Sequence, residues 1–238
     1  MLVYSPELFE LQLAFAERVR LLSGHPLEQV LLDYTNLYVR FGLGRDLDPE
    51  HPDWRAYLSG LRSAADPVEW THRFYLRDPE ASTAPTVLAM VGCFSYAIAD
   101  DCIRLHFQNV DPQRSPLALA RAPQRRAELA ALFELIKRDV REDLPVVGRS
   151  WLYNLEAYRR LFPPAYTTSA RILRNRFRSM PLWGQFVNRH GDIKPHIATP
   201  FLETLAQHPT LDNLDACFPL QVLTATAPQS DFLDFYGV

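Results

Sequence analysis

Cys93 and His106 are the residues whose types could supply a nucleophile and its base. If Val87–Ile98 and Cys102–Gln108 pair as an antiparallel hairpin that turns at Ala99-Asp100, Cys93 faces His106. Side chains directly opposite on such strands have Cβ atoms about 4.5–5.5 Å apart, so the imidazole could take up the thiol proton. The alternative is that Cys93 is an ordinary small buried residue and that His106 belongs to a polar sheet face.

A second candidate site is the run from Ser150 to Asn154, which we expect at the junction between a strand over 146–153 and a short helix over 155–161. Ligands collect at the carboxyl ends of parallel strands, where the start of a helix offers free backbone N–H groups. Tyr153 could act there as a general acid, and Asn154 and Trp151 could contact a ligand. Helix capping explains Asn154 equally well, and core packing is the alternative for Trp151.

Arginines make up 23 of the 25 basic residues, and four of them are close together at Arg171, Arg174, Arg176 and Arg178. On a strand the last three would share one face, and on a helix Arg171, Arg174 and Arg178 would share one stripe. Such a set could bind a phosphate or carboxylate group of a substrate by bidentate contacts. The alternative is a solvated face that is paired with acids.

The composition of the chain limits the classes of function to which these candidate residues could contribute. The chain has 238 residues, of which 47% are hydrophobic, and a net charge of -3. A disordered chain lacks this apolar content, and a dedicated nucleic-acid-binding protein carries a stronger basic excess. The three cysteines and seven histidines show no zinc-ligand spacing, so no metal site is expected. Without a signal peptide or an apolar span in the sequence, we expect a soluble cytoplasmic protein that acts on a small molecule.

The first 80 residues predict a helical subdomain. Ser5-Pro6 opens an apolar stripe that Gly24 ends, and a second stripe follows over 27–41. A third helix begins near Pro52, and a fourth begins at Asp66-Pro67. These helices also carry the aromatic side chains of Trp54, Tyr57, Trp70 and Tyr75.

The next stretch alternates with a period of two, as strands do. With Ile98 opposite Asp101, partner numbers sum to 199, and Tyr96 and Phe94 then face Ile103 and Leu105 on one apolar side. The other side is small and polar. It holds Cys93, Ser95 and Ala97 opposite His106, Arg104 and Cys102.

The remainder predicts helices and strands in alternation. We expect a helix over 123–140, a second hairpin over 182–197 that turns at 189–191, a helix from Thr199-Pro200 to Gln207, and a last strand within 217–225. The predicted fold is α+β: a helical N-terminal subdomain (1–80) packed on a mixed or antiparallel sheet with flanking helices (81–238).

The order of these elements over 86–197 is similar to that of the GNAT-type acyltransferases. In that family a run R/Q-x-x-G-x-G/A at the start of the helix after the long hairpin binds the pyrophosphate of acyl-CoA. The corresponding residues here, 111–117, read DPQRSPL and contain no glycine. A helix start capped by Ser115, with Arg114 beside it, could still meet a phosphate. The segment 154–162 occupies the place of the family's post-strand helix.

The resemblance implies an enzyme that uses acyl-CoA to acylate an amine. The amine would attack a thioester bound across splayed strands, and Tyr153 would protonate the departing thiolate. The alternative is a non-catalytic protein that binds a partner or ligand through an exposed patch made by the N-terminal aromatic residues.

Overall fold

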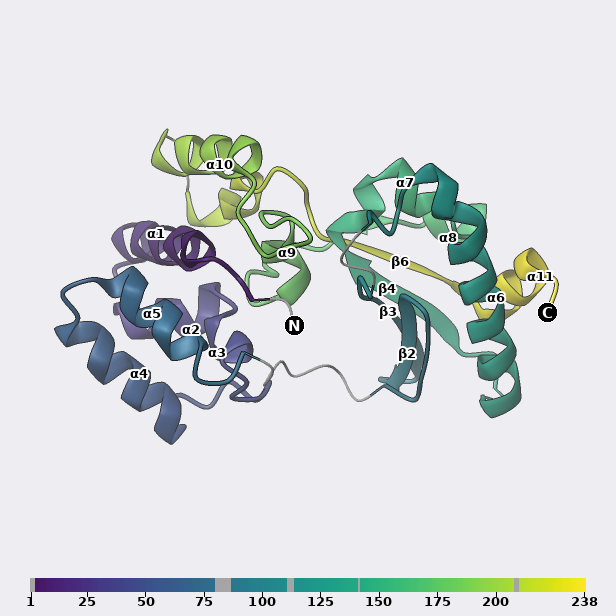
Figure 1. Ribbon diagram of the computed structural model, residues 1–238, viewed down its shortest axis with the longest axis horizontal. Coiled ribbons are helices and arrows are strands. Elements are labelled where there is room, and N and C mark those ends of the chain that lie inside the picture. The colour runs from purple at the N-terminus through teal and green to yellow at the C-terminus, as the bar shows by residue number, and fades with distance from the viewer. Residues whose placement is uncertain (1–2, 80–86, 111–113, 141, 208–209) are drawn as a thin grey trace. The chain divides into compact units, whose positions relative to one another are not determined.

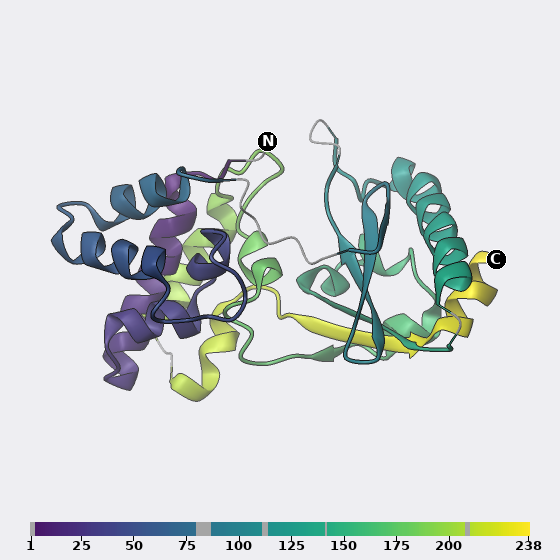
Figure 2. The ribbon, with the colours of Figure 1, turned by 90° about the horizontal axis from the view of Figure 1, so that it is seen from below.

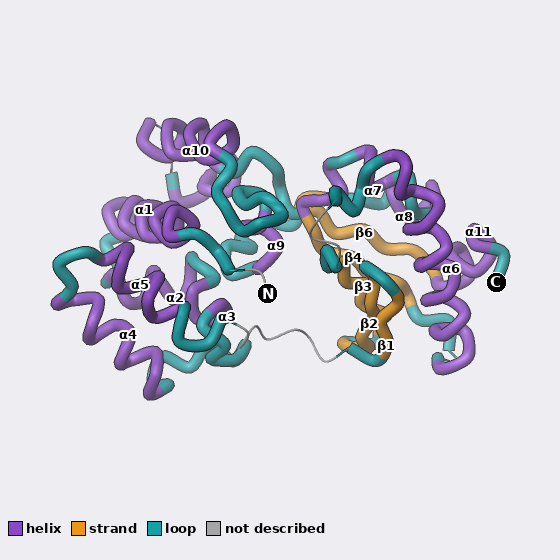
Figure 3. The backbone as a smooth tube through the Cα atoms, in the orientation of Figure 1, coloured by secondary structure: helices purple, strands orange, loops and turns teal. Residues whose placement is uncertain are grey.

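The computed structural model describes residues 3–79, 87–110, 114–140, 142–207 and 210–238. The chain forms two compact units. Unit 1 comprises residues 1–83 and 174–220, and unit 2 comprises residues 84–173 and 221–238. Helices build unit 1, and the strands lie in unit 2 (Figure 3). The α+β class is therefore confirmed, but residues 174–220, which we expected with the sheet, belong to the helical unit.

Unit 1 begins with the helices predicted from the sequence: α1 (Pro6–Ser23), α2 (Leu27–Tyr34), α3 (Leu37–Arg40), α4 (Pro52–Ser63) and α5 (Pro67–Tyr75) (Figure 1). Gly24 ends α1 in the left-handed conformation, with φ of 71°. Asp66 caps α5 by accepting hydrogen bonds from Val68 N and Glu69 N. The stripe over 27–41 forms two helices rather than one, because the backbone is extended at Thr35.

The second segment of unit 1 contains α9 (Met180–Gly184), α10 (Pro195–Gln207) and a 3-10 helix, η3 (Leu211–Cys217). Apart from one bridge between Val187 and Ile193, the predicted hairpin over 182–197 is not formed. The segment belongs to unit 1 because its aromatic side chains surround a residue of α1. The ring of Phe15 lies 5.4–6.0 Å from four of them: Phe177, Trp183, Phe201 and Phe218.

The aromatic residues of the N-terminal helices are core residues. Trp54, Tyr57 and Tyr75 are each no more than 1% exposed, and Trp70 is half-buried with its indole N–H donating to the carbonyl of Tyr57. The exposed aromatic patch that would favour a non-catalytic interaction protein is thus not formed by these residues.

Unit 2 holds one sheet in the described part of the chain, with strand order β1-β2-β3-β4-β6-β5. The strands are β1 (Ala89–Val91), β2 (Phe94–Ala99), β3 (Cys102–Phe107), β4 (Pro145–Ser150), β5 (Arg171–Ile172) and β6 (Leu223–Pro228). The pair β3 and β4 is parallel, and the other pairs are antiparallel.

Helices cover one face of this sheet (Figures 1 and 2). They are α6 (Ala122–Asp139), α7 (Glu156–Arg159), α8 (Pro164–Thr168) and α11 (Gln229–Tyr236), together with the 3-10 helices η1 (Leu119–Arg121) and η2 (Trp151–Asn154). The apolar side of β2 and β3 packs against α6 through a continuous core. Helix α11 was not predicted, and the last predicted strand is β6, which begins later than expected.

The hairpin differs from its predicted register by two residues. Phe94 pairs with Phe107 and Ile98 with Ile103, so partner numbers sum to 201. The turn is Asp100-Asp101, and both residues have positive φ, 55° and 53°, as a two-residue hairpin turn of type I′ requires. A shift of two keeps the side chains of β2 and β3 on their predicted faces, but Cys93, in the turn before β2, lies in the core against α6 and not on the predicted small polar face. The stretch 87–98 is also not one strand, since it turns back at Gly92-Cys93 between β1 and β2.

Candidate functional site

The carboxyl ends of β3 and β4 form the candidate site. These parallel strands pair over Ile103–Leu105 and Val146–Gly148 only. Beyond that point β3 continues beside β2, where His106 pairs with Ser95, and β4 continues beside β6, where Arg149 pairs with Thr224. Each strand therefore keeps its outer partner while the two strands stop pairing with each other. The parallel ladder thus stops two residues before the ends of both strands, and this carboxyl-terminal edge of the sheet is here called the splayed end of β3 and β4.

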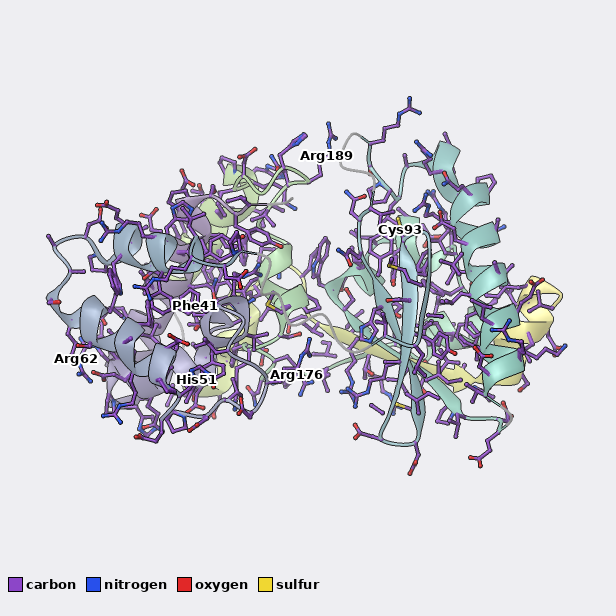
Figure 4. All side chains as sticks on the ribbon, turned by 60° about the horizontal axis from the view of Figure 1, so that its bottom comes forward. Phe41, His51, Arg62, Cys93, Arg176 and Arg189 are labelled. Atoms are coloured by element: carbon purple, nitrogen blue, oxygen red, sulfur yellow. The ribbon has the colours of Figure 1, made fainter. Side chains whose placement is uncertain are left out.

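Cys93 lies at this edge, at the beginning of β2 (Figure 4), but not opposite His106. Its backbone N–H donates to Glu128 Oε2 at 3.0 Å, and its sulfur accepts a hydrogen bond from Arg125. Arg125 in turn pairs with Glu128 at 3.0 Å. Cys93 is buried, 1% exposed, and the predicted pairing of Cys93 with His106 across the hairpin is wrong. The residue instead joins the β1–β2 turn to α6.

His106 pairs with Ser95 across the hairpin, because the register differs by two residues from the predicted one. It therefore shares a sheet face with Ser95, Ala97 and Arg104, the face opposite to the helix-covered core. The predicted small polar face is formed, with a serine rather than a cysteine opposite the imidazole.

The run Ser150–Asn154 is also at this edge, directly after β4. The strand ends at Ser150, whose Oγ accepts a hydrogen bond from Leu152 N at 3.1 Å, and Trp151–Asn154 form η2. Asn154 does not cap the following helix, because Leu155 is the N-cap of α7. The Asn154 amide instead donates to the carbonyls of Trp151 and Gln221, at 2.7 and 2.8 Å. It ties the end of β4 to the chain that enters β6.

Tyr153 lies in the core on the helix-covered face of the sheet, within a cluster of phenol side chains. Its hydroxyl lies 2.6 Å from that of Tyr166, and its ring contacts Tyr158 edge to face at 5.1 Å. Burial raises the pKa of Tyr153, Tyr158 and Tyr166 well above the usual value near 10. Tyr158 also contacts Phe107, at the splayed end of β3, with ring centroids 5.5 Å apart. These phenols are protonated at neutral pH, and each is a weaker acid than an ordinary tyrosine.

The start of α6 lies at the same edge, since Arg125 and Glu128 of its first turns contact Cys93. Ser115 does not cap it: η1 begins at Leu119, Arg121 is the N-cap of α6, and Ser115 and Arg114 are exposed before them. Residues 111–113 of the segment compared with the pyrophosphate loop lie outside the described residues.

The four arginines at 171–178 do not form one strand face or one helix stripe. Arg171 lies in β5 of unit 2, whereas the other three follow in an irregular segment of unit 1. That segment turns at Asn175, with φ of 57°, whose N–H donates to the carboxylate of Asp215. Arg178 is 3.7 Å from Asp33, as the acid-paired alternative requires for that residue. Arg174, Arg176 and Arg178 are exposed, and Figure 4 labels Arg176.

A different set of arginines surrounds an open groove in unit 2, here called the arginine groove. Its volume is about 690 Å³. It is lined by Arg126, Tyr153, Glu156, Arg159, Arg160, Phe162, Pro164, Thr167, Thr168, Ala170, Leu223 and Phe235. The sequence signal for this groove is the pair of double arginines, 125–126 and 159–160, which are too far apart in the chain for their spacing to bring them together.

Among the described residues, no group of three histidine, cysteine or acidic side chains is placed to hold a metal ion. In the same part of the chain, no helix combines the length and the apolar character that crossing a bilayer requires. No protein-family model matches the chain, and neither a curated protein nor a solved structure shows significant similarity to it.

Proposed function

We propose that unit 2 transfers an acyl group from a thioester of the acyl-CoA type to an amine. The observation that carries the proposal is the separation of β3 from β4 beyond Leu105 and Gly148. The family that the order of elements resembles binds its thioester across two splayed strands. A splayed parallel pair leaves backbone N–H and C=O groups on the facing edges without ladder partners, and an extended ligand with amide groups can bind to them.

The N-terminus of α6 is a second feature that favours a CoA ester as the ligand. It lies at the edge where the strands separate, and a helix start favours anions because free N–H groups and the helix dipole point toward them. Arg121 is the N-cap of α6, and Arg126 lies in the second turn of the helix. Arg160 donates to the carbonyl of Leu117, in the segment before α6, at 2.8 Å. Guanidinium groups bind phosphates by bidentate contacts, and a CoA ester carries phosphates. These cations would serve in place of the missing glycine-rich loop.

The reaction needs an amine in its neutral, unprotonated form and one proton donor. The amine nitrogen forms a bond to the acyl carbon, the carbon–sulfur bond breaks, the nitrogen loses a proton to solvent, and the leaving thiolate gains one. Tyr153 is the donor that the resemblance implies, and its raised pKa keeps it protonated. Its hydroxyl is engaged with Tyr166, whereas Tyr158 contacts Phe107 at the splayed end of β3. Tyr153 and Tyr158 are therefore both candidates for the donor.

Thermal unfolding with and without acetyl-CoA tests the proposal. A ligand that binds only the folded protein stabilises it by about 2.7 kcal/mol at a concentration of 100 times its Kd. We expect acetyl-CoA to raise the Tm and free acetate to leave it unchanged. If no CoA ester raises the Tm at millimolar concentration, the proposal is wrong. If binding is found, Tyr153→Phe and Tyr158→Phe identify the donor as the variant that lowers kcat while acetyl-CoA still raises the Tm.

A further inference from the structure

We infer that the arginine groove binds a small amphipathic anion, with a carboxylate or phosphate head group and an apolar tail. The groove shares Arg126 and Arg160 with the cations assigned above to the CoA phosphates, but the inference rests on the lining of the groove and is tested with ligands that are not thioesters. The groove combines two chemistries that an anion of this kind needs. Three of its lining residues are arginines and one is an acid, and the rest of its wall is largely aromatic and aliphatic. Pockets of about 300–1,000 Å³ hold small ligands, and this one has about 690 Å³.

Two of the arginines are held in place by the backbone. Arg126 donates to the carbonyl of Arg160 at 2.8 Å, and Arg160 donates to the carbonyl of Leu117 at 2.8 Å. Each contact uses one of the five N–H groups of a guanidinium and thereby fixes its position. The buried Nε of Arg160 has no hydrogen-bond partner among the described residues. The two cations are thus pre-positioned and retain donors for an anion, which lowers the ordering cost of binding.

The third arginine is less available. Arg159 pairs with Glu156 at 3.0 Å on the exposed side of α7. This pair neutralises itself, so the net positive charge of the lining comes from Arg126 and Arg160. A single anionic head group between these two residues matches that charge, and a cationic ligand would be repelled.

The apolar side of the groove would contact the tail of such an anion. Phe235 of α11 is 38% exposed, and the guanidinium carbon of Arg126 lies 6.0 Å from the centre of its ring. Phe162 and Leu223 continue the wall beside it. An exposed phenylalanine next to fixed cations provides the apolar contact that a free inorganic anion would not use. We therefore expect the tail to increase affinity over the head group alone.

Calorimetric titration of the full chain with decanoate and with decyl phosphate, both below micelle formation, tests the inference. We expect one site for at least one of them, with the tighter of the two naming the head group. Inorganic phosphate should bind at least about tenfold more weakly than decyl phosphate. Decyltrimethylammonium, with the same tail and the opposite charge, should not bind. Absence of binding by both anions, or equal binding of the cation, overturns the inference.

Variants locate the site. Arg126→Gln and Arg160→Gln should each weaken anion binding at least about tenfold. Arg138→Gln, at the other end of α6 and 69% exposed, is the matched control and should bind as the unaltered protein does. Phe235→Ala removes an exposed side chain without touching the arginines, so it serves if the arginine variants fail to fold, and it should weaken decanoate more than phosphate. Equal affinities of Phe235→Ala, Arg126→Gln and Arg138→Gln would place the binding elsewhere and contradict the inference.

Discussion

Gly148 of β4 lies against the hydroxyl of Tyr153, so closely that a Cβ at position 148 would overlap that oxygen and the Tyr166 hydroxyl. The same glycine makes the last pair between β3 and β4, with Leu105. Tyr153 and Tyr166 thus fill the core on the helix-covered face of the sheet, at the point where the ladder between β3 and β4 ends.

Replacing Gly148 by alanine tests this contact. Overpacking a filled core costs about 1–3 kcal/mol, and the Tyr153–Tyr166 hydrogen bond would have to break to make room. We expect Gly148→Ala to lower the free energy of unfolding in urea by that amount. In a Tyr153→Phe, Tyr166→Phe background the added methyl group meets fewer atoms, so its cost should fall. Equal costs in both backgrounds would contradict this packing.

The hairpin turn predicts a stabilising substitution. Asp101 has φ of 53°, a conformation that costs an ordinary residue about 1–2 kcal/mol and glycine little. Asp101→Gly should raise the free energy of unfolding by up to about 1 kcal/mol. Asp101→Ala is the control, and it should not stabilise, since alanine keeps the Cβ and loses the polar group that tolerates this conformation. Thermal melts of the two variants should therefore move in different directions.

This turn also shows what could be predicted from the sequence. Alternation along β2 and β3 assigned each side chain to the correct face, because a period of two is insensitive to a shift of two. It could not fix the register, which depends on the two-residue turn at Asp100-Asp101. The predicted pairing of Cys93 with His106 is therefore wrong, since His106 pairs with Ser95.

The splayed strands and the arginine groove could not be predicted, for a different reason. β3 and β4 are separated by α6 in the chain, and pairing between such segments leaves no periodic signal. Arg126, Arg160 and Phe235 come from three segments that only the folded core brings together. Residues 174–220 carry apolar patterns that fit either unit, and the contacts around Phe15 decide the matter.

Those contacts predict a large effect of Phe15→Ala. The side chain is 0% exposed and lies in an aromatic cluster, and truncating a buried phenylalanine costs about 3–5 kcal/mol. Leu21→Ala on the same helix is the control, because Leu21 is 61% exposed and should change stability by no more than about 0.5 kcal/mol. Urea unfolding followed by tryptophan fluorescence separates the two. Similar costs would mean that α1 does not anchor the 174–220 segment.

The buried phenols predict a loss of stability in alkali. Burial raises the pKa of Tyr153, Tyr158, Tyr166 and Tyr236, so above the usual value near 10 the unfolded chain loses protons that the folded protein retains. Stability is complete below pH 10 and falls above it, by about 1.4 kcal/mol per pH unit for each such tyrosine. Urea unfolding at intervals from pH 8 to pH 11 measures the slope. Tyr158→Phe should reduce it by one tyrosine's share, and an unchanged slope would contradict the burial of that phenol.

Amide hydrogen exchange with and without acetyl-CoA is the most direct measurement of the central claim, that the gap between β3 and β4 holds the thioester. We expect saturating acetyl-CoA to slow exchange in the peptides that contain His106–Gln108 and Arg149–Trp151, and in the first turn of α6. Free acetate should leave these peptides unchanged. Unaltered exchange at these segments, or protection confined to unit 1, would contradict the assignment of the site.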